Sequence, residues 1–214
     1  MASDRMLLKP LAILLGAALL FGGCSSHRPP ASLTWHTTAQ ALQPARIAVI
    51  PAWLGAGVGR SAQGVTDSLT ASLRELGKHE VITLTIEQRD RLMPSDALFS
   101  NQLSTESLLR IRDAVKADAI VVARVEQFDA YDPIAVGMVV HMISCQDGAK
   151  LWDAAGHFDG RRVEIQDDIE YWHSLANGKA GGDLAGWRGT LSSPQAFTRY
   201  VTDRLVWTLN PIEP

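Results

Sequence analysis

The sequence predicts an α/β fold of three layers, in which a short mixed sheet is covered by helices and closed by a C-terminal helix. The first observation is an alternation of β-branched runs with amphipathic helical patterns, in the order βαβαβ. The second is a pair of apolar runs joined by Asp147-Gly148, which predicts a β-hairpin. With 214 residues, 46% of them hydrophobic, the chain has enough apolar side chains for one such core.

The first strand and the first helix are predicted over residues 46–76. Residues 46–51 read Arg-Ile-Ala-Val-Ile-Pro, a β-branched run that proline stops, and this predicts a strand. Residues 61–76 then carry valine and leucine at helical spacing, and Gly77 follows immediately. An apolar stripe that ends at glycine is typical of a helix with its C-cap.

The second strand, the second helix and the third strand follow in the same order. Four apolar residues within 81–86 predict the second strand. Ser104 is suited to cap a helix whose apolar residues, from Leu108 to Val115, share one face. Residues 119–125 are almost entirely apolar, as expected for a central strand that is covered on both faces.

The second half of the chain is predicted to add the hairpin and the closing helix. The hairpin strands are residues 137–145 and 150–158. Residues 193–194, Ser-Pro, provide an N-cap and a first helical position, and apolar residues follow at helical spacing until Pro211. We therefore expect a single folded domain over residues 46–210.

Residues 159–192 are rich in glycine and irregular in pattern, so we expect an elaborate surface insertion with one helix near 165–176. Tyr171, Trp172 and Trp187 lie in this segment. Aromatic residues are enriched at protein interfaces, and these three are the candidate partner-binding residues.

An acidic cluster precedes two of these aromatic residues. It consists of Asp167, Asp168 and Glu170. A calcium loop would need more oxygen ligands at loop spacing and a closing carboxylate, which the sequence lacks. We therefore interpret the cluster as the solvated face of a helix.

The N-terminal segment has the pattern of an export signal. Residues 1–23 carry charged, apolar and small regions in the order of a secretory signal peptide, and the apolar run of residues 11–21 is shorter than the roughly 20 residues that span a bilayer. Residues 20–24, Leu-Phe-Gly-Gly-Cys, resemble the bacterial lipoprotein signal, in which the cysteine is lipidated and becomes the mature N-terminus. Cys24 is therefore the predicted lipidation site; an ordinary signal peptide with an incidental cysteine is the alternative.

Residues 24–45 contain three prolines and scattered polar residues without an apolar period, and we interpret them as a lipid-anchored flexible tether. Fully extended, about 20 residues reach on the order of 70 Å. In lipoproteins of Gram-negative type, aspartate after the cysteine retains the protein at the inner membrane. Ser25 and Ser26 follow here, which by that resemblance favours the outer membrane and a domain that faces the periplasm.

The composition excludes several classes of function. The chain has 20 Lys and Arg against 23 Asp and Glu, a net charge of −3, so nucleic acid is not an expected partner. Its two cysteines, Cys24 and Cys145, exclude a disulfide scaffold and a cysteine-rich zinc site. With Cys24 lipidated, Cys145 is expected to be a buried, unpaired thiol.

A glycine-rich segment lies between the first strand and the first helix, the context in which such a turn binds phosphate. Its spacing fits neither known pattern, because a dinucleotide fingerprint needs glycine and a P-loop needs lysine where arginine stands. We therefore predict no cofactor. A flexible loop is the simpler interpretation, and an anion-binding loop is the functional one. The candidate residues are Gly55, Gly57, Gly59 and Arg60.

His141 and His157 lie in the two strands of the predicted hairpin. One register puts their rings on opposite faces, about 10 Å apart. A register shifted by one residue puts them on the same face but four positions apart. Neither arrangement brings two ligands to one ion, so we predict no metal site. The sequence contains no Gly-x-Ser-x-Gly or His-Glu-x-x-His motif, so hydrolase chemistry has no support.

Short motifs between residues 46 and 158 occur in an order that resembles a group of bacterial envelope lipoproteins. They are the strand 47–51, the helix that ends at Gly77, the run Ala-Asp-Ala-Ile-Val-Val at 117–122 and the hairpin 142–152, which restarts with Leu-Trp. The group includes the curli secretion lipoproteins, the penicillin-binding-protein activator lipoproteins and the N-terminal domain of the Tol-Pal translocation protein. The resemblance implies a three-layer α/β domain, without catalysis, that binds other envelope proteins.

We therefore expect a non-catalytic outer-membrane lipoprotein that acts by protein contact in envelope assembly, secretion or cell-wall regulation. Its lipid would bind the membrane, its partner would be another envelope protein, and a homo-oligomer is left open. The alternative is a periplasmic ligand-binding or hydrolytic protein that uses the glycine loop 55–60 and the insertion 159–192.

Overall fold

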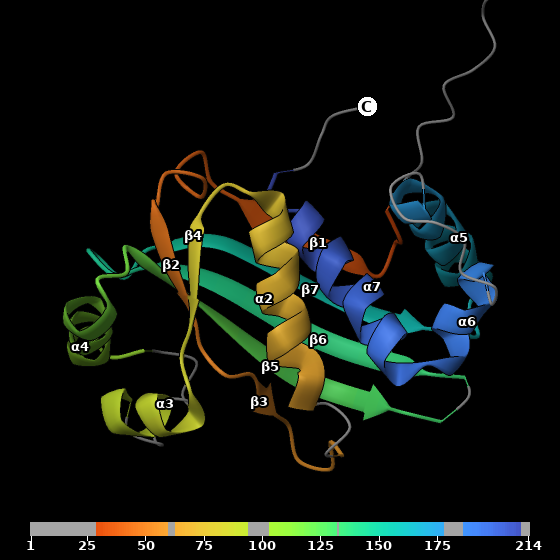
Figure 1. The fold of residues 1–214 in the computed structure, drawn as a ribbon, viewed down its shortest axis with the longest axis horizontal. Coiled ribbons are helices and arrows are strands. Elements are labelled where there is room, and N and C mark those ends of the chain that lie inside the picture. The colour runs from red at the N-terminus through yellow and green to blue at the C-terminus, as the bar shows by residue number, and fades with distance from the viewer. Residues whose placement is uncertain (1–28, 60–62, 94–102, 132, 178–185, 211–214) are drawn as a thin grey trace, which may run out of the picture.

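The computed structural model describes residues 29–59, 63–93, 103–131, 133–177 and 186–210, and all that follows concerns these residues. They form an α/β fold around one mixed sheet (Figure 1). In chain order, the strands and helices are β1 (Leu33–Thr37), β2 (Arg46–Val49), β3 (Trp53–Leu54), α2 (Val65–Leu76), β4 (Glu80–Thr83), α3 (Ile86–Leu92), α4 (Thr105–Val115), β5 (Ala119–Asp129), β6 (Ala135–Ser144), β7 (Lys150–Asp159), α5 (Val163–Asn177), α6 (Gly186–Ser192) and α7 (Pro194–Trp207).

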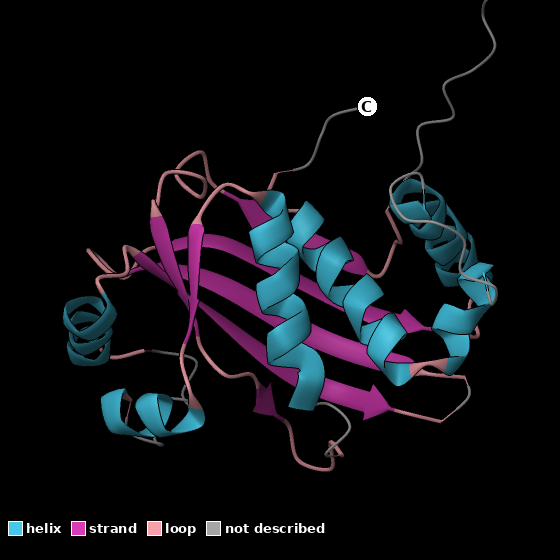
Figure 2. Cartoon of the chain, viewed as in Figure 1, coloured by secondary structure: helices cyan, strands magenta, loops and turns pink. Residues whose placement is uncertain are grey.

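The sheet has seven strands in the described part of the chain. Six follow the order β1-β7-β6-β5-β2-β4, and β3 pairs with β5 beyond the end of β2. β2 is parallel to both β4 and β5, whereas β5, β6, β7 and β1 form an antiparallel series (Figure 2). The predicted α/β class, the hairpin and the closing C-terminal helix are therefore confirmed.

Helices cover the two faces of the sheet unequally. On one face, α2 and α7 lie side by side over the strands, and α5 with α6 continues this layer at one end (Figure 1). The main core lies beneath them, and its largest side chains are Trp152, Tyr200, Phe158 and Phe197. On the second face, α3 and α4 pack over a smaller cluster around Ile50 and Ile120, next to β2 and β4.

The end of α2 and the starts of α4 and α7 lie where the sequence predicts them, although α2 begins at Val65, later than the expected residue 61. α2 ends at Gly77, whose φ of 67° lies in the left-handed region and whose N–H donates to the Arg74 carbonyl. α4 begins after Ser104, whose hydroxyl oxygen accepts the N–H of Ser107. α7 begins in the same way after Ser193, with proline at its first position.

α3 is a difference from the expected pattern. The apolar pattern predicts Ile86 in the second strand, but that strand ends at Thr83 and Ile86 begins the helix. Thr85 and Gln88 form a reciprocal capping box, in which each side chain accepts the backbone N–H of the other residue. No residue of α3 is buried, so an apolar pattern could not reveal this helix.

β1 corrects the expected tether. Residues 33–37 lie within the segment 24–45, yet they form an antiparallel strand against β7. Only Leu33 is buried, so the alternation typical of a strand is weak here. The described part of the fold therefore includes a strand ahead of Arg46.

The insertion 159–192 is more regular than expected. The helix predicted near 165–176 is present as α5, and α6 is a second, short helix that packs against α5 and α7. The glycines that made the segment look irregular lie largely in residues 178–185, which fall outside the described residues.

The register of the hairpin is the second of the two alternatives. His141 lies opposite Asp153, and His157 lies opposite Gly137. An irregularity near the turn, where Met142 pairs with Trp152 but Ile143 pairs with Lys150, shifts the pairing by one residue. The two histidines therefore share a face of the sheet, four positions apart.

Candidate interaction surface

Part of the second face of the sheet is not covered by a buried cluster of the described residues. Here the four antiparallel strands present side chains that are mostly exposed or half-buried, in contrast to the buried residues on the opposite side of the same strands. We call this surface the open face. Its residues are Thr34, His36, Arg124, Gln127, Gly137, Val139, His141, Asp153, Ala155 and His157.

The register aligns these residues in rows across the strands. One row reads His36, Asp153 and His141, and the next reads Thr34, Ala155, Val139 and Arg124. A shallow groove of about 340 Å³ crosses the following row, where Gly137 lies between His157 and Gln127. The groove is open and is lined mostly by small and polar side chains.

β1 forms the edge of the sheet beside the open face. Thr38 N–H donates to the Leu151 carbonyl at 2.9 Å, so Thr38 and Leu151 are a hydrogen-bonded pair of the antiparallel ladder. Hydrogen-bonded pairs alternate with non-hydrogen-bonded pairs along such a ladder. The backbone groups of Thr34 and His36 therefore point toward β7, and those of Trp35 and Thr37 point outward. Among the described residues no strand pairs with this outer side.

The edge lacks the usual protection against strand pairing. Natural edge strands carry charged residues, proline or a bulge, and β1, which reads Leu-Thr-Trp-His-Thr, has none of these. Trp35 is 39% exposed, and its ring packs edge-on against Trp207 with 6.0 Å between ring centroids. An exposed indole on an unprotected edge is typical of a binding surface.

His141 is a half-buried ionisable group of the open face. Its Nδ1 is buried and has no hydrogen-bond partner in the described structure. Because His157 lies four positions along the strands, roughly 13 Å away, the two rings do not converge on one point. In the described ranges, no three potential metal ligands come together.

Acidification is expected to destabilise the fold through His141. Burial lowers the pKa of His141 below 6.5, and nearby Lys150 and Arg124 add to this, whereas Asp153 opposes it. As the pH falls, the unfolded chain therefore takes up a proton at a higher pH than the folded protein does. The stability linked to neutral His141 is complete above pH 6.5 and is lost as the pH falls through that value.

Urea unfolding between about pH 8 and about pH 5.5, compared with His141→Gln, measures the effect. The wild-type protein should lose more of its free energy of unfolding than the variant over this range. Parallel curves for the two proteins would contradict the prediction.

In the glycine loop, the backbone of Gly55 already forms hydrogen bonds within the protein. Gly55 N–H donates to the Val125 carbonyl at 2.8 Å, and a Cβ at Gly55 would lie 3.0 Å from that oxygen. Gly57 has a φ of 85° in the turn that follows, and Gly59 is exposed. Arg60, the charge proposed to bind an anion, lies outside the described residues.

The three aromatic residues of the insertion are only partly available to a partner. Trp172 is half-buried, its ring packs edge-on against Tyr200, and its Nε1 donates to Asp203 at 3.1 Å. Trp187 packs partly against the main core and carries the Arg188 guanidinium over its ring. Tyr171 is 38% exposed on α5. The structure thus brings them to one helical layer but not to one exposed patch.

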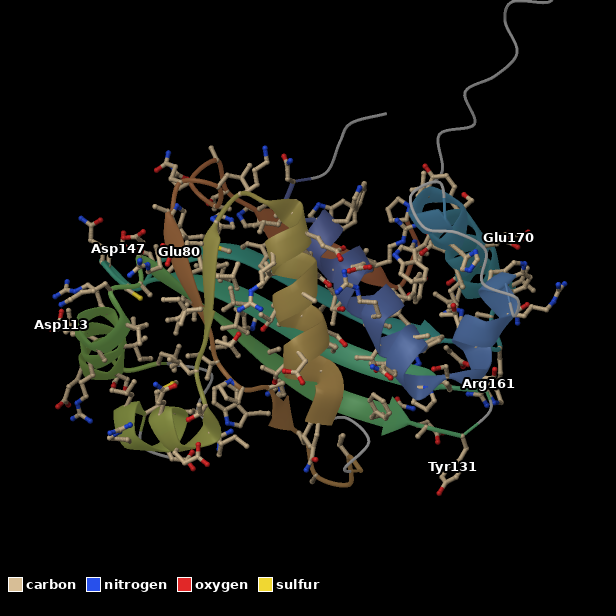
Figure 3. The ribbon with its side chains drawn as sticks, viewed as in Figure 1. Glu80, Asp113, Tyr131, Asp147, Arg161 and Glu170 are labelled. Atoms are coloured by element: carbon tan, nitrogen blue, oxygen red, sulfur yellow. The ribbon has the colours of Figure 1, made fainter. Side chains whose placement is uncertain are left out.

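The acidic cluster does not share one environment, which corrects its interpretation as a solvated face. Asp167 and Glu170 are exposed, and Glu170 lies on the outer side of α5 (Figure 3). Asp168 is buried and accepts hydrogen bonds from the Tyr200 hydroxyl at 2.6 Å and from Arg204 Nε at 2.7 Å. Asp168 lies at helical spacing from the apolar residues of α5, and this spacing indicates that it faces the core with them.

Cys145 is buried, as predicted. Burial raises the pKa of its thiol to about 11, so the reactive thiolate is scarce at neutral pH. Cys24 lies outside the described residues. No helix in the described ranges is both long enough and apolar enough to cross a membrane.

A larger cavity of about 660 Å³ lies at another end of the sheet, beside the β6–β7 turn. Its lining includes Gln43, Arg112 and Asp147, all exposed side chains. The carboxylate of Asp118 in this cavity accepts the backbone N–H groups of Ala45 and Arg46, both at 2.9 Å. That carboxylate therefore has a structural partner, and the cavity offers no enclosed ligand site.

Comparisons with known proteins show similarity to solved structures only. No protein-family model and no curated protein matches the sequence. The PelC L103M dodecamer from Paraburkholderia phytofirmans is 12% identical, with a TM-score of 0.48 over 84% of this chain and 96% of PelC. Lipoprotein GNA1162 from Neisseria meningitidis is 14% identical, with a TM-score of 0.42 over 65% of this chain and 99% of that one. The LpoB C-terminal domain from Escherichia coli is 12% identical, with a TM-score of 0.38 over 53% and 82%.

Proposed function

We propose that this protein is a non-catalytic envelope lipoprotein that is anchored to the outer membrane through Cys24 and acts by binding a protein partner in the envelope, either a different protein or a further copy of itself. The observation that carries the proposal is the unprotected edge of β1, which adjoins the open face. Main-chain groups along such an edge give affinity to an added strand, and neighbouring side chains give specificity. The periplasm-facing side of the outer membrane is where the export signal and Ser25 and Ser26 would place the domain.

The position of the edge relative to the anchor supports this proposal. Only about nine residues separate Cys24 from Leu33, a reach of roughly 30 Å when fully extended. An anchored domain would therefore hold β1 close to the membrane surface. Partners in the same membrane would meet this edge first.

The alternative function, a ligand-binding or hydrolytic site, has less support. The Gly55 amide that an anion would need already donates to Val125. The insertion supplies helices whose inner faces pack on the core, with Trp172 and Asp168 engaged in internal hydrogen bonds. Among the candidate aromatic residues, Tyr171 keeps enough exposure to serve as a second contact.

Photo-crosslinking from the anchored protein in its native envelope tests the proposal. A photoreactive amino acid that replaces His36, on β1, is expected to capture an envelope protein. The same photoreactive amino acid in place of Arg110, which is exposed on α4, serves as the matched control. The His36 product should be lost in the Cys24→Ala form, which is not anchored. Capture from Tyr171 but not from His36 would move the contact to α5, and equal capture from Arg110 would contradict a specific surface.

A further inference from the structure

We propose that the occupant of the β1 edge is a second copy of this chain, paired antiparallel about Trp35. The inference rests on the proposed function and names the partner for the same surface. The two sheets would then join through β1 into one continuous sheet with a two-fold axis between the Trp35 residues. The open faces of both copies would lie on the same side.

The backbone geometry of β1 suits this symmetric pairing. Trp35 and Thr37 point their backbone groups outward, whereas the Leu33 N–H is already bonded to the Pro30 carbonyl at 2.9 Å. In a pair centred on Trp35, each Trp35 exchanges both backbone hydrogen bonds with its counterpart. Each Thr37 N–H reaches the Leu33 carbonyl of the second copy. The outward groups of Trp35 therefore all find partners.

The side chains of β1 are compatible with their own symmetry mates. Thr34 lies opposite His36 of the second copy on the open face, a pairing of two uncharged polar groups when histidine is neutral. On the other face the two Trp35 rings approach each other, each with its own Trp207 behind it. The exposed part of each indole is thus covered by the other copy.

The other edge of the sheet fits a second copy less well. β4 begins at Glu80, which lies at the sheet edge and forms a salt bridge with Arg46 at 2.9 Å (Figure 3). A charge of this kind discourages strand addition. A head-to-tail contact between β1 and β4 would also desolvate part of this ion pair, whereas pairing of β1 with itself buries no charge.

Anchoring explains how so small a contact forms. A five-residue strand on each side buries less than the roughly 1,200 Å² of a stable interface between free proteins. A tether of about nine residues keeps every copy near the same membrane with its edge at a similar height. This confinement raises the effective concentration of one edge for another.

A cysteine pair tests the register directly. Two full-length chains with different tags, one carrying Thr34→Cys and the other His36→Cys, are co-expressed and oxidised in isolated envelopes. In the proposed pair these positions face each other at a non-hydrogen-bonded site, with Cα atoms about 4.5 Å apart, which permits a disulfide. A dimer that carries both tags is the expected product.

The controls separate this register from chance collision. Thr34→Cys combined with Arg110→Cys should lose the doubly tagged dimer, because α4 lies away from β1. Both edge substitutions are at exposed positions, and thermal unfolding of each variant confirms that it folds. Cys145 does not interfere, since its thiol is buried.

The possible failures distinguish the two proposals. If the Thr34→Cys and His36→Cys chains form no joint dimer while His36 photo-crosslinks a different envelope protein, the second-copy proposal is overturned and the proposed function stands. If the edge crosslinks to neither, the second-copy proposal and the assignment of β1 as the binding edge are both overturned. A dimer that forms equally with Arg110→Cys also overturns the proposed register.

Discussion

Asp168→Ala is expected to lower the free energy of unfolding by about 3–5 kcal/mol, the loss typical of a buried ion pair that keeps only one partner. Asp168 is 1% exposed and Arg204 is 7% exposed, so the substitution leaves the Arg204 guanidinium buried without its carboxylate. The Tyr200 hydroxyl loses its acceptor at the same time. Because these contacts join α5 to α7, the substitution should also weaken the packing of α5 against the core.

The neighbouring residue provides a matched control for this prediction. Asp167 has the same charge on the same helix but is exposed, and Asp167→Ala should change stability by no more than about 0.5 kcal/mol. Urea unfolding of both variants at neutral pH measures the difference. A similar small effect for both would show that the Asp168 pair contributes little.

Trp152→Ala should destabilise the protein to a comparable extent, by about 3–5 kcal/mol. Trp152 is fully buried beneath α7, and its Nε1 donates to the Thr208 hydroxyl at 2.9 Å. The substitution removes the largest buried side chain of the core and leaves a cavity between β7 and the end of α7. It also removes the donor that fixes Thr208.

A second tryptophan serves as the control, because its substitution shows how much of the loss of stability depends on burial and how much on removing a tryptophan. Trp35 is partly exposed and forms an edge-to-face pair with Trp207, so Trp35→Ala should cost about 0.5–1.5 kcal/mol. Thr208→Val isolates the hydrogen bond and should cost about 1–3 kcal/mol, because the buried indole N–H keeps no acceptor. Equal losses at Trp152 and Trp35 would contradict the assignment of Trp152 to the core.

Elements with strong local patterns could be predicted from the sequence. The continuous apolar run of β5, the Asp147-Gly148 turn and the Ser193 cap of α7 each depend on nearby residues alone. α3 had no such pattern, because its capping box precedes a helix without a buried face. The hairpin register depended on one extra residue near Leu151, which an alternating pattern does not reveal.

The candidate surface depended on information that local patterns lack. β1 is distant in sequence from β7, its only partner in the described sheet, and a mostly exposed edge strand leaves little apolar signal. The aromatic residues of the insertion are predicted to bind a partner because of their residue type alone, yet the indole N–H of Trp172 forms a hydrogen bond inside the protein. The partner of Asp168, Arg204, lies on another helix, so the sequence around Asp168 does not distinguish it from its exposed neighbours.

The place of β1 in the sheet also decides which fragments of the chain can fold cleanly. A fragment that starts at Arg46, where the sequence pattern becomes regular, would lack β1 and turn β7 into the edge. β7 is ten residues long, and half of its side chains belong to the core face, including Trp152 and Phe158. A long unpaired edge favours aggregation, and loss of β1 would also uncover the core residues of β7 that β1 borders. The smallest soluble unit must therefore begin ahead of Leu33.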